Sequence, residues 1–374
     1  MKTKAAVLRG VGQDWRIEEI ELGDPVPGEV QVRLVASGMC HSDHHLRTGG
    51  SPIPFPVIGG HEGSGIVTKV GPGVTSLVEG DHVVTAFIPA CGTCGPCSRG
   101  LQNLCDEGAG LLTGRSISDG TYRASAKGEP LVPMCLLGTF SPYITVNEAS
   151  LVKIEKDIPL EAAALLGCGV ATGWGSATAI GGTKVGDTVV VVGVGGVGIN
   201  AVQGAAAAGA RHVIAVDPVE FKRHMALALG ATHVYASLEE AMEPVRDLTW
   251  GLMADVTVLT VGDIEGDIIQ PALTITAKAG QVVVTAMGDA TKNEVTLNLF
   301  ELTLLQKRVQ GAIFGGVGPR TQIPALLHHY RSGALKLEEL ATTVYRLEDV
   351  NQGYDDMLAG KNLRGIIRYT DADF

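Results

Sequence analysis

The chain has 374 residues, of which 45% are hydrophobic and 18% charged, and its formal net charge is −11. A chain of this length can bury the cores of two domains. Its acidic charge argues against a nucleic-acid partner bound through phosphates and against an anionic membrane surface. We expect a cytoplasmic protein, because Arg9 interrupts the apolar run that follows the basic start and no secretory signal results.

The first part of the chain predicts a β-rich domain. Short apolar runs such as "EVQVRLVAS", "GIVTKVG" and "DHVVTAF" alternate there with turn residues, a texture typical of short strands. Near residue 170 the sequence pattern changes. Six strand-like runs follow, with helix-compatible segments between most of them: "TVVVVG", "HVIAVD", "THVYA", "DVTVLTV", "QVVVTAM" and "RVQGAIF". This alternation predicts a parallel, doubly wound sheet.

Two further features concern helices. The uncharged stretch 188–210 has the length of a membrane span, but its many glycines and changing pattern favour a strand followed by a buried helix. Towards the end, "TQIPALLHHYRSG" and "EDVNQGYDDMLAGK" predict helices and "RGIIRY" predicts a last strand. We expect this final segment to pack on the first domain.

The glycine-rich turn predicts a dinucleotide site. Gly193, Gly195 and Gly198, with Gly196 and Val197 between them, follow an apolar strand and open an alanine-rich helix. Such glycines permit a tight turn, close approach of the pyrophosphate and close packing of the helix on the strand. Asp217 ends the next strand and would bind the ribose hydroxyls, which favours NAD over NADP; Lys222 could add a donor there. A glycine-rich turn without a ligand is the alternative.

Four cysteines gather in one lobe, "CGTCGPCSRGLQNLC", at Cys91, Cys94, Cys97 and Cys105. Two short steps and a longer return can surround zinc with four thiolates, and such a closed site is structural. Two alternatives to zinc stay open. The first is a pair of disulfides, which the reduced thiols of the expected compartment disfavour. The second is an iron–sulfur cluster. A nucleic-acid module lacks support, because Arg99 is the only basic residue within the lobe.

The remaining cysteines point to a second, open metal site. Cys40 begins "CHSDHH", "GGHEGSG" supplies His61 and Glu62, and "GCGV" contains Cys168. Two thiolates and one imidazole leave a fourth position for water or substrate, the arrangement of catalytic zinc. Cys135 is left over, either lining the pocket or packing.

These motifs carry a resemblance. Gly60-His61-Glu62-x-x-Gly65-x5-Gly71-x-x-Val74 resembles the signature of zinc-containing medium-chain alcohol dehydrogenases. "CHSD", the four-cysteine lobe, "GCGV", the glycine-rich turn and "KNLRG" follow in that family's order, so the similarity covers essentially the whole chain. It implies a chaperonin-10-like catalytic domain over 1–168 (with the lobe at 91–105), a Rossmann domain over 169–313, and a return to the catalytic domain over 314–374.

The resemblance also implies roles for individual residues. Cys40, His61 and Cys168 would bind catalytic zinc, Asp43 would hold the other ring nitrogen of His61, and Glu62 would lie behind the metal. Ser42 would accept the proton of the substrate hydroxyl, and His45 would pass it to solvent. His41 and Arg364 would face the cofactor phosphates. The expected substrate pocket contains Ser51, Phe87 and Met134, beside Ser42, Gly110 and Cys135.

The implied substrate is a primary or medium-sized alcohol or aldehyde. Ser51 and Ala109 stand where relatives that oxidise thiol-conjugated formaldehyde carry a charged pair, which disfavours that substrate. Segments such as "MCLLGTF" and "VDPVEFKR" resemble the nitrosoaniline-dependent, mycofactocin-associated actinobacterial enzymes, in which NAD stays bound and an external acceptor reoxidises it. Retained and exchangeable NAD both stay open, as does a non-catalytic nucleotide-binding relative. The segment 108–142 resembles the longer loop of dimeric members, so we expect a homodimer, with a tetramer as the alternative, paired through "RVQGAIF".

Overall fold

The computed structural model describes residues 1–289 and 292–374 and divides into two units. The first unit comprises Met1–Cys168, Gly318–Ala325 and Leu337–Phe374; the second comprises Gly169–Val317 and Leu326–Lys336. The predicted return over 314–374 differs from these units in two places, 314–317 and Leu326–Lys336, which belong to the second unit. For Leu326–Lys336 the reason is packing, because the ring centroids of His329 and Trp174 lie 4.8 Å apart. The side chain of Gln203 also donates to the Lys336 carbonyl at 3.2 Å and accepts from the Lys336 N–H at 2.7 Å.

The first unit contains two β-sheets. One is a closed barrel in the order β1-β2-β7-β8-β4, and the other runs β10-β6-β5-β3-β18-β17, with β9 also paired to β3. Along β3, Val30, Val32 and Leu34 are fully buried, as expected where alternate side chains face one core. The strands are β1 (Lys2–Leu8), β2 (Arg16–Leu22), β3 (Glu29–Gly38), β4 (Val57–Ile58), β5 (Glu62–Val70), β6 (His82–Thr85), β7 (Ala124–Ala126), β8 (Glu129–Pro133), β9 (Tyr143–Asn147), β10 (Leu151–Ile154), β17 (Ala341–Tyr345) and β18 (Arg364–Arg368).

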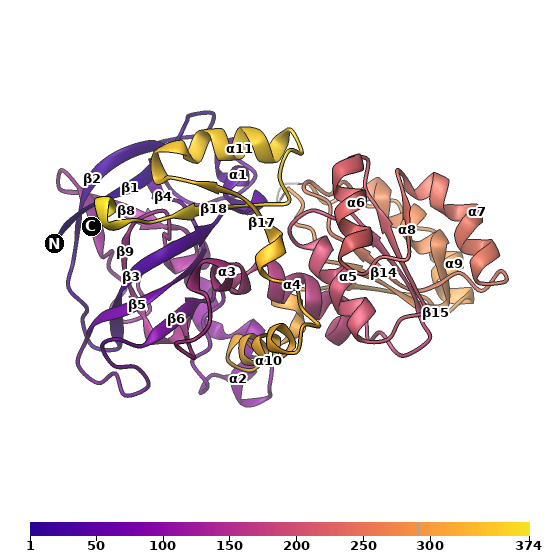
Figure 1. Ribbon diagram of the computed structural model, residues 1–374, viewed down its shortest axis with the longest axis horizontal. Coiled ribbons are helices and arrows are strands. Elements are labelled where there is room, and N and C mark those ends of the chain that lie inside the picture. The colour runs from indigo at the N-terminus through magenta and orange to yellow at the C-terminus, as the bar shows by residue number, and fades with distance from the viewer. Residues whose placement is uncertain (290–291) are drawn as a thin grey trace. The chain divides into compact units, whose positions relative to one another are not determined.

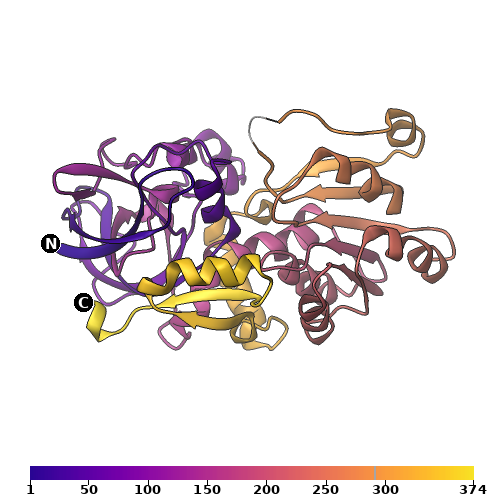
Figure 2. The ribbon, with the colours of Figure 1, turned by 90° about the horizontal axis from the view of Figure 1, so that it is seen from above.

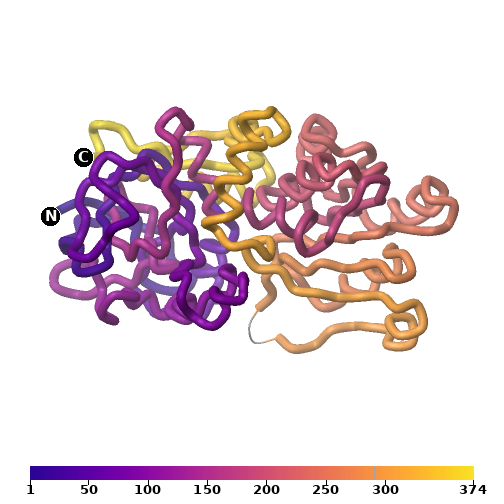
Figure 3. The backbone as a smooth tube through the Cα atoms, turned by 90° about the horizontal axis from the view of Figure 1, so that it is seen from below, coloured from indigo at the N-terminus to yellow at the C-terminus, as the bar shows by residue number. Residues whose placement is uncertain are grey.

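The end of the chain completes this first unit. β18 pairs antiparallel with β3, in the register Ile366 to Gly38, so the late and early strands share one sheet (Figure 1). Both termini lie in this unit (Figure 3), where Lys4 forms an ion pair with Asp373 at 2.8 Å. The α-helices that begin within this unit are α1 (His41–Thr48), α2 (Gly95–Ser98), α3 (Leu160–Ala163), α10 (Pro319–Arg331) and α11 (Val350–Leu358).

The second unit is a six-stranded sheet in the order β13-β12-β11-β14-β15-β16, with every pair parallel. The order confirms the predicted doubly wound fold, and helices cover the sheet (Figure 2). The stretch 188–210 is a strand and a helix, as predicted. The elements are α4 (Gly169–Gly175), β11 (Thr188–Val192), α5 (Gly198–Ala207), β12 (His212–Val216), α6 (Glu220–Ala228), β13 (His233–Tyr235), α7 (Leu238–Leu248), β14 (Ala254–Leu259), α8 (Ile269–Ile275), β15 (Thr276–Val284), α9 (Leu299–Leu304) and β16 (Arg308–Gly311).

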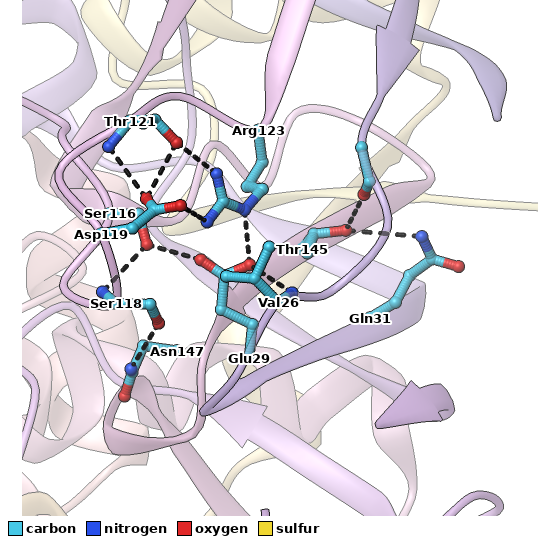
Figure 4. A network of polar contacts seen from close by, with 11 residues as sticks. Val26, Glu29, Gln31, Ser116, Ser118, Asp119, Thr121, Arg123, Thr145 and Asn147 are labelled. Carbon is cyan, nitrogen blue, oxygen red and sulfur yellow. Dashed lines mark hydrogen bonds and ion pairs between the residues drawn. The ribbon is translucent and has the colours of Figure 1, made fainter. Parts of the chain in front are cut away.

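A buried ionic network fixes the segment that follows the four-cysteine lobe. The Glu29 carboxylate is fully buried and accepts hydrogen bonds from Arg123 Nε and the Ser116 hydroxyl, each at 2.5 Å (Figure 4). Arg123 also donates to Asp119 at 2.7 Å. Because a buried charge is costly unless it is paired, this network anchors the segment to the start of β3.

The described residues contain no single helix that is long and apolar enough to cross a membrane. One bent pair of helices, over 160–167 and 169–180, meets the length and composition criteria only when taken together.

Candidate active site

The four lobe cysteines form one cluster of sulfur atoms. Their Sγ atoms all lie within 4.8 Å of one another, with Cys91 to Cys97 at 3.9 Å and Cys94 to Cys105 at 3.8 Å. These separations exceed an S–S bond, and all seven cysteines, which belong to the described residues, are free. Backbone N–H groups also point at the sulfurs, as that of Cys94 does to Cys91 Sγ at 3.3 Å. The donor set fits a tetrahedral zinc ion.

A second cluster brings together residues from three distant parts of the sequence. Ligand atoms of Cys40, His61, Glu62 and Cys168 lie within 4.8 Å of one another, and all four residues are buried. Cys40 precedes α1, His61 precedes β5, and Cys168 follows a short 3₁₀ turn over Ala164–Gly167. Two thiols and an imidazole on three separate elements fit a catalytic zinc ion that keeps one position open.

Two glycines allow the chain to approach this closely. Gly60 has φ +86°, which favours glycine, and its N–H donates to Asp43 Oδ1 at 2.7 Å. At Gly38, a Cβ atom would collide with the carboxylate of Glu62. The backbone on both sides of the cluster is therefore shaped for these side chains.

The ionisable groups of the second cluster change one another's pKa values. The Cys168 thiol, which hydrogen-bonds to Cys40, and the nearby His61 charge hold the pKa of Cys40 well below its usual range despite burial. The same contact with Cys40, together with burial, raises the pKa of Cys168. Burial opposes a charge on His61, but Asp43 and Cys40 raise the pKa of His61 well above its usual value. These shifts favour a Cys40 thiolate that faces a protonated His61, and a bound cation would take the place of that proton, because zinc ligation requires a thiolate and a neutral imidazole.

Behind the cluster lies a fully buried ion pair. The Arg364 guanidinium donates to Glu62 Oε2 and, at 3.2 Å, to the Met39 carbonyl. Burial raises the pKa of Glu62, although the charge of Arg364 opposes that rise. Arg364 was predicted to face the cofactor phosphates; in the structure its partners are Glu62 and the backbone beside Cys40. Sequence spacing gave no sign of this pair, because its members are 302 positions apart.

The predicted relay residues share helix α1. Ser42 Oγ lies 3.7 Å from Cys40 Sγ, and the rings of His41 and His45 are 5.2 Å apart. Asp43 is fully buried and its Oδ2 lies 3.3 Å from Nδ1 of His61, so the other ring nitrogen is left for a metal.

The predicted pocket residues separate into two groups. Phe87 packs edge-on against His61, with ring centroids 5.9 Å apart, and the N–H of Ser51 donates to the carbonyl of His45 at 3.3 Å. Met134 is buried in the apolar core of the first unit, against which Phe87 also packs. Neighbouring Cys135 has φ +52°, and burial raises its pKa to about 11, so it is a neutral thiol.

The glycine-rich turn of the second unit has the geometry of a cofactor cradle. Gly193 has φ +83°, and a Cβ at Gly198 would collide with the Gly193 carbonyl. Asp217 lies buried at the end of β12, where its carboxylate accepts the N–H of Val194 at 2.9 Å. The nearest atom to a Cβ on Gly195 would be Lys222 Nζ, 3.9 Å away, which leaves that side of the turn open. Thr260, which the sequence did not single out, donates to the Gly193 carbonyl at 2.6 Å and braces the turn.

Comparison with known proteins identifies the family. Residues 26–156 match the alcohol dehydrogenase GroES-like domain, and residues 196–332 match the zinc-binding dehydrogenase domain. Alcohol dehydrogenase B of Mycobacterium tuberculosis (strain ATCC 25618 / H37Rv) is 55% identical over 374 residues, covering 100% of both chains. The chain belongs to the zinc-containing medium-chain alcohol dehydrogenases.

Other members of this family are also similar. The NDMA-dependent alcohol dehydrogenase of Amycolatopsis methanolica is 50% identical over 370 residues, which are 99% of this chain and 100% of that protein. The solved structure of an alcohol dehydrogenase zinc-binding domain protein from Burkholderia ambifaria has a TM-score of 0.92 and 32% identity, with 99% of each chain covered. This medium-chain dehydrogenase is therefore an NAD-dependent zinc enzyme that acts on alcohols, as its motifs predicted.

Proposed function

We propose that the enzyme oxidises a primary or medium-sized alcohol, with two zinc ions per subunit and an NAD that stays bound between turnovers. The observation that carries the catalytic part is the convergence of Cys40, His61 and Cys168 within 4.8 Å. These residues would hold the catalytic zinc, and the four lobe cysteines the structural one. When bound, zinc supplies a Lewis acid for the alcohol oxygen, and NAD supplies the hydride acceptor.

The chain's own side chains handle the proton. Ser42, beside Cys40 on α1, accepts the proton of the substrate hydroxyl, and His45 on the same helix passes it to solvent. Asp43 keeps His61 oriented. The turn at Gly193–Gly198 and Asp217 would hold the dinucleotide, with His41 and Lys222 as further donors to it. Phe87 and Ser51 would border the substrate.

The name of one relative supports the proposal that NAD is retained. The 50% identical relative is named NDMA-dependent, which fits a cofactor that an external acceptor reoxidises in place. The alternative substrate, thiol-conjugated formaldehyde, draws on the S-(hydroxymethyl)glutathione dehydrogenase of Synechocystis, at 36% identity. Ser51 and Ala109 disfavour it, because neither supplies a charge for such a conjugate.

The near-ultraviolet spectrum of desalted protein tests retention. A reduced-nicotinamide band that forms on addition of a primary alcohol, without added NAD and in proportion to enzyme, is the expected result. A band that forms only with added NAD and grows with turnover would show ordinary exchange. No band under either condition, across several alcohols, would favour a non-catalytic nucleotide-binding relative.

The metal site has a separate test. Cys40→Ser is expected to lose one of two zinc ions per subunit and nearly all activity. Cys135→Ser is the matched control, since Cys135 is a neutral thiol outside the cluster, and it should keep both ions. Full zinc content and full activity in Cys40→Ser would contradict the proposed ligand set.

For assembly we propose a homodimer paired through β16. This strand forms the edge of the six-stranded sheet and all four of its residues are exposed. Apolar side chains near it are exposed too: Phe300 by 74%, Leu304 by 65% and Ile313 by 38%. An unpaired edge with apolar neighbours is a surface suited to a twofold partner. Light scattering of Val309→Lys, which places a charge in the edge strand, should show monomers where the wild type gives dimers.

A further inference from the structure

A fully buried tyrosine, Tyr354 of α11, packs against helix α1, which carries Asp43: its ring stacks on that of His44, with centroids 6.4 Å apart. Its side chain is 0% exposed. Burial, together with the negative charges of Asp43 and Cys40, raises the pKa of Tyr354 well above its usual value. Neither the Tyr354 hydroxyl nor Asp43 Oδ2 has full hydrogen-bond geometry with any described residue. The Tyr354 ring also packs against Phe140, and Phe140 lies against Gly60, whose N–H binds Asp43. Two buried polar atoms of complementary type therefore share one region of the core.

Packing alone does not explain a tyrosine here. The ring stacks on Trp15, with centroids 6.2 Å apart and planes at 26°, and also touches Phe140 at 6.4 Å. Asn351, one turn earlier on α11, exchanges two hydrogen bonds with the backbone of Trp15, at 3.0 and 2.9 Å. A phenylalanine would make the same ring contacts without a buried hydroxyl, and an unsatisfied hydroxyl costs about 1–3 kcal/mol.

The carboxylate of Asp43 has room for another donor. It is fully buried; Oδ1 accepts the N–H of Gly60 at 2.7 Å, and Oδ2 lies 3.3 Å from His61 Nδ1. Each carboxylate oxygen can accept two hydrogen bonds, and a buried carboxylate is stable only when its acceptors are satisfied.

We propose that Tyr354 is a positioning residue for the catalytic metal. Its hydroxyl donates to Asp43 Oδ2, Asp43 holds the Nδ1–H of His61, and the Nε2 of His61 is thereby presented to the metal. The proposal rests on the proposed function, in which Cys40, His61 and Cys168 hold zinc. Outer partners of this kind orient the ligating imidazole and fix its tautomer.

Zinc release from the full-length, zinc-loaded enzyme to an excess of chelator tests the proposal. The release phase that is missing in Cys40→Ser identifies the catalytic site, and the other phase belongs to the lobe. Tyr354→Phe should speed the catalytic phase about tenfold and leave the lobe phase unchanged. Tyr345→Phe is the matched control: its hydroxyl bonds Asp356 at 2.9 Å and Asn362 at 3.1 Å instead, so both of its phases should match the wild type.

Three results would overturn the proposal. If the catalytic phase of Tyr354→Phe stays within twofold of the wild-type rate, Tyr354 has no positioning role. If both phases speed up equally, the substitution has only destabilised the fold in general. A wild type without a Cys40-dependent phase would refute the proposed function itself, and this inference with it. In the wild type, nuclear magnetic resonance should also show a slowly exchanging Tyr354 hydroxyl proton close to the Nδ1 proton of His61. Its absence would overturn the proposal even if Tyr354→Phe does not fold.

Discussion

Arg364→Met leaves a buried carboxylate without its counter-charge and should destabilise the first unit strongly. Glu62 is 0% and Arg364 3% exposed, so solvent does not screen the loss. Removing one member of such a buried pair costs about 3–5 kcal/mol. Because burial already raises the pKa of Glu62, the carboxyl can take up a proton in the variant, so we expect a loss near the lower end, about 3 kcal/mol.

Hydrogen exchange of β18, read by mass spectrometry, measures this loss, since β18 pairs with β3 within the core of that unit. Glu62→Gln combined with Arg364→Met removes both charges, so the double variant should lose less stability than the two single variants added together. The reasoning fails if Arg364→Met changes the free energy of opening by less than about 1 kcal/mol, the value typical of an exposed pair, or if the two losses simply add.

Further predictions concern the four-cysteine lobe, the glycine-rich turn and the segment around Asp119. Cys97→Ser should lose the lobe zinc, and calorimetry should show a melting temperature many degrees lower; an unchanged temperature would make the lobe metal dispensable. Gly198→Ala forces a Cβ against a backbone carbonyl of the turn, so NAD affinity measured by titration should fall at least about tenfold; equal affinity would contradict the cradle. The N–H of Thr121 and then Arg123 lower the pKa of Asp119 to about 2. Its stabilisation is therefore present above about pH 4 and lost as the pH falls towards 2. In urea unfolding, wild type and Asp119→Asn should differ at neutral pH and converge in acid, whereas a constant difference would exclude the ionised carboxylate as the cause.

Short-range patterns were sufficient to predict much of this protein. Apolar runs predicted central strands such as β11 and β12, because a strand buried on both faces is apolar throughout. The outer strands β13 and β16 are less buried, and the alternation of strands with helices predicted them. Gly193 and Gly198 marked the tight turn after β11, because only glycine fits its backbone. The spacing of the lobe cysteines predicted their cluster, because a few residues of chain can fold back on themselves in few ways.

Only the tertiary structure decided which distant residues meet. It joined Arg364 to Glu62, packed Tyr354 beside the helix that carries Asp43, and assigned 314–317 and 326–336 to the second unit. None of these follows from spacing, because contacts between remote segments depend on how whole sheets and helices pack. The sequence by itself determined the helices and strands and the residue types of the candidate metal ligands, because their causes lie within a few neighbouring residues. Packing decided the surroundings that set the charge and orientation of those ligands.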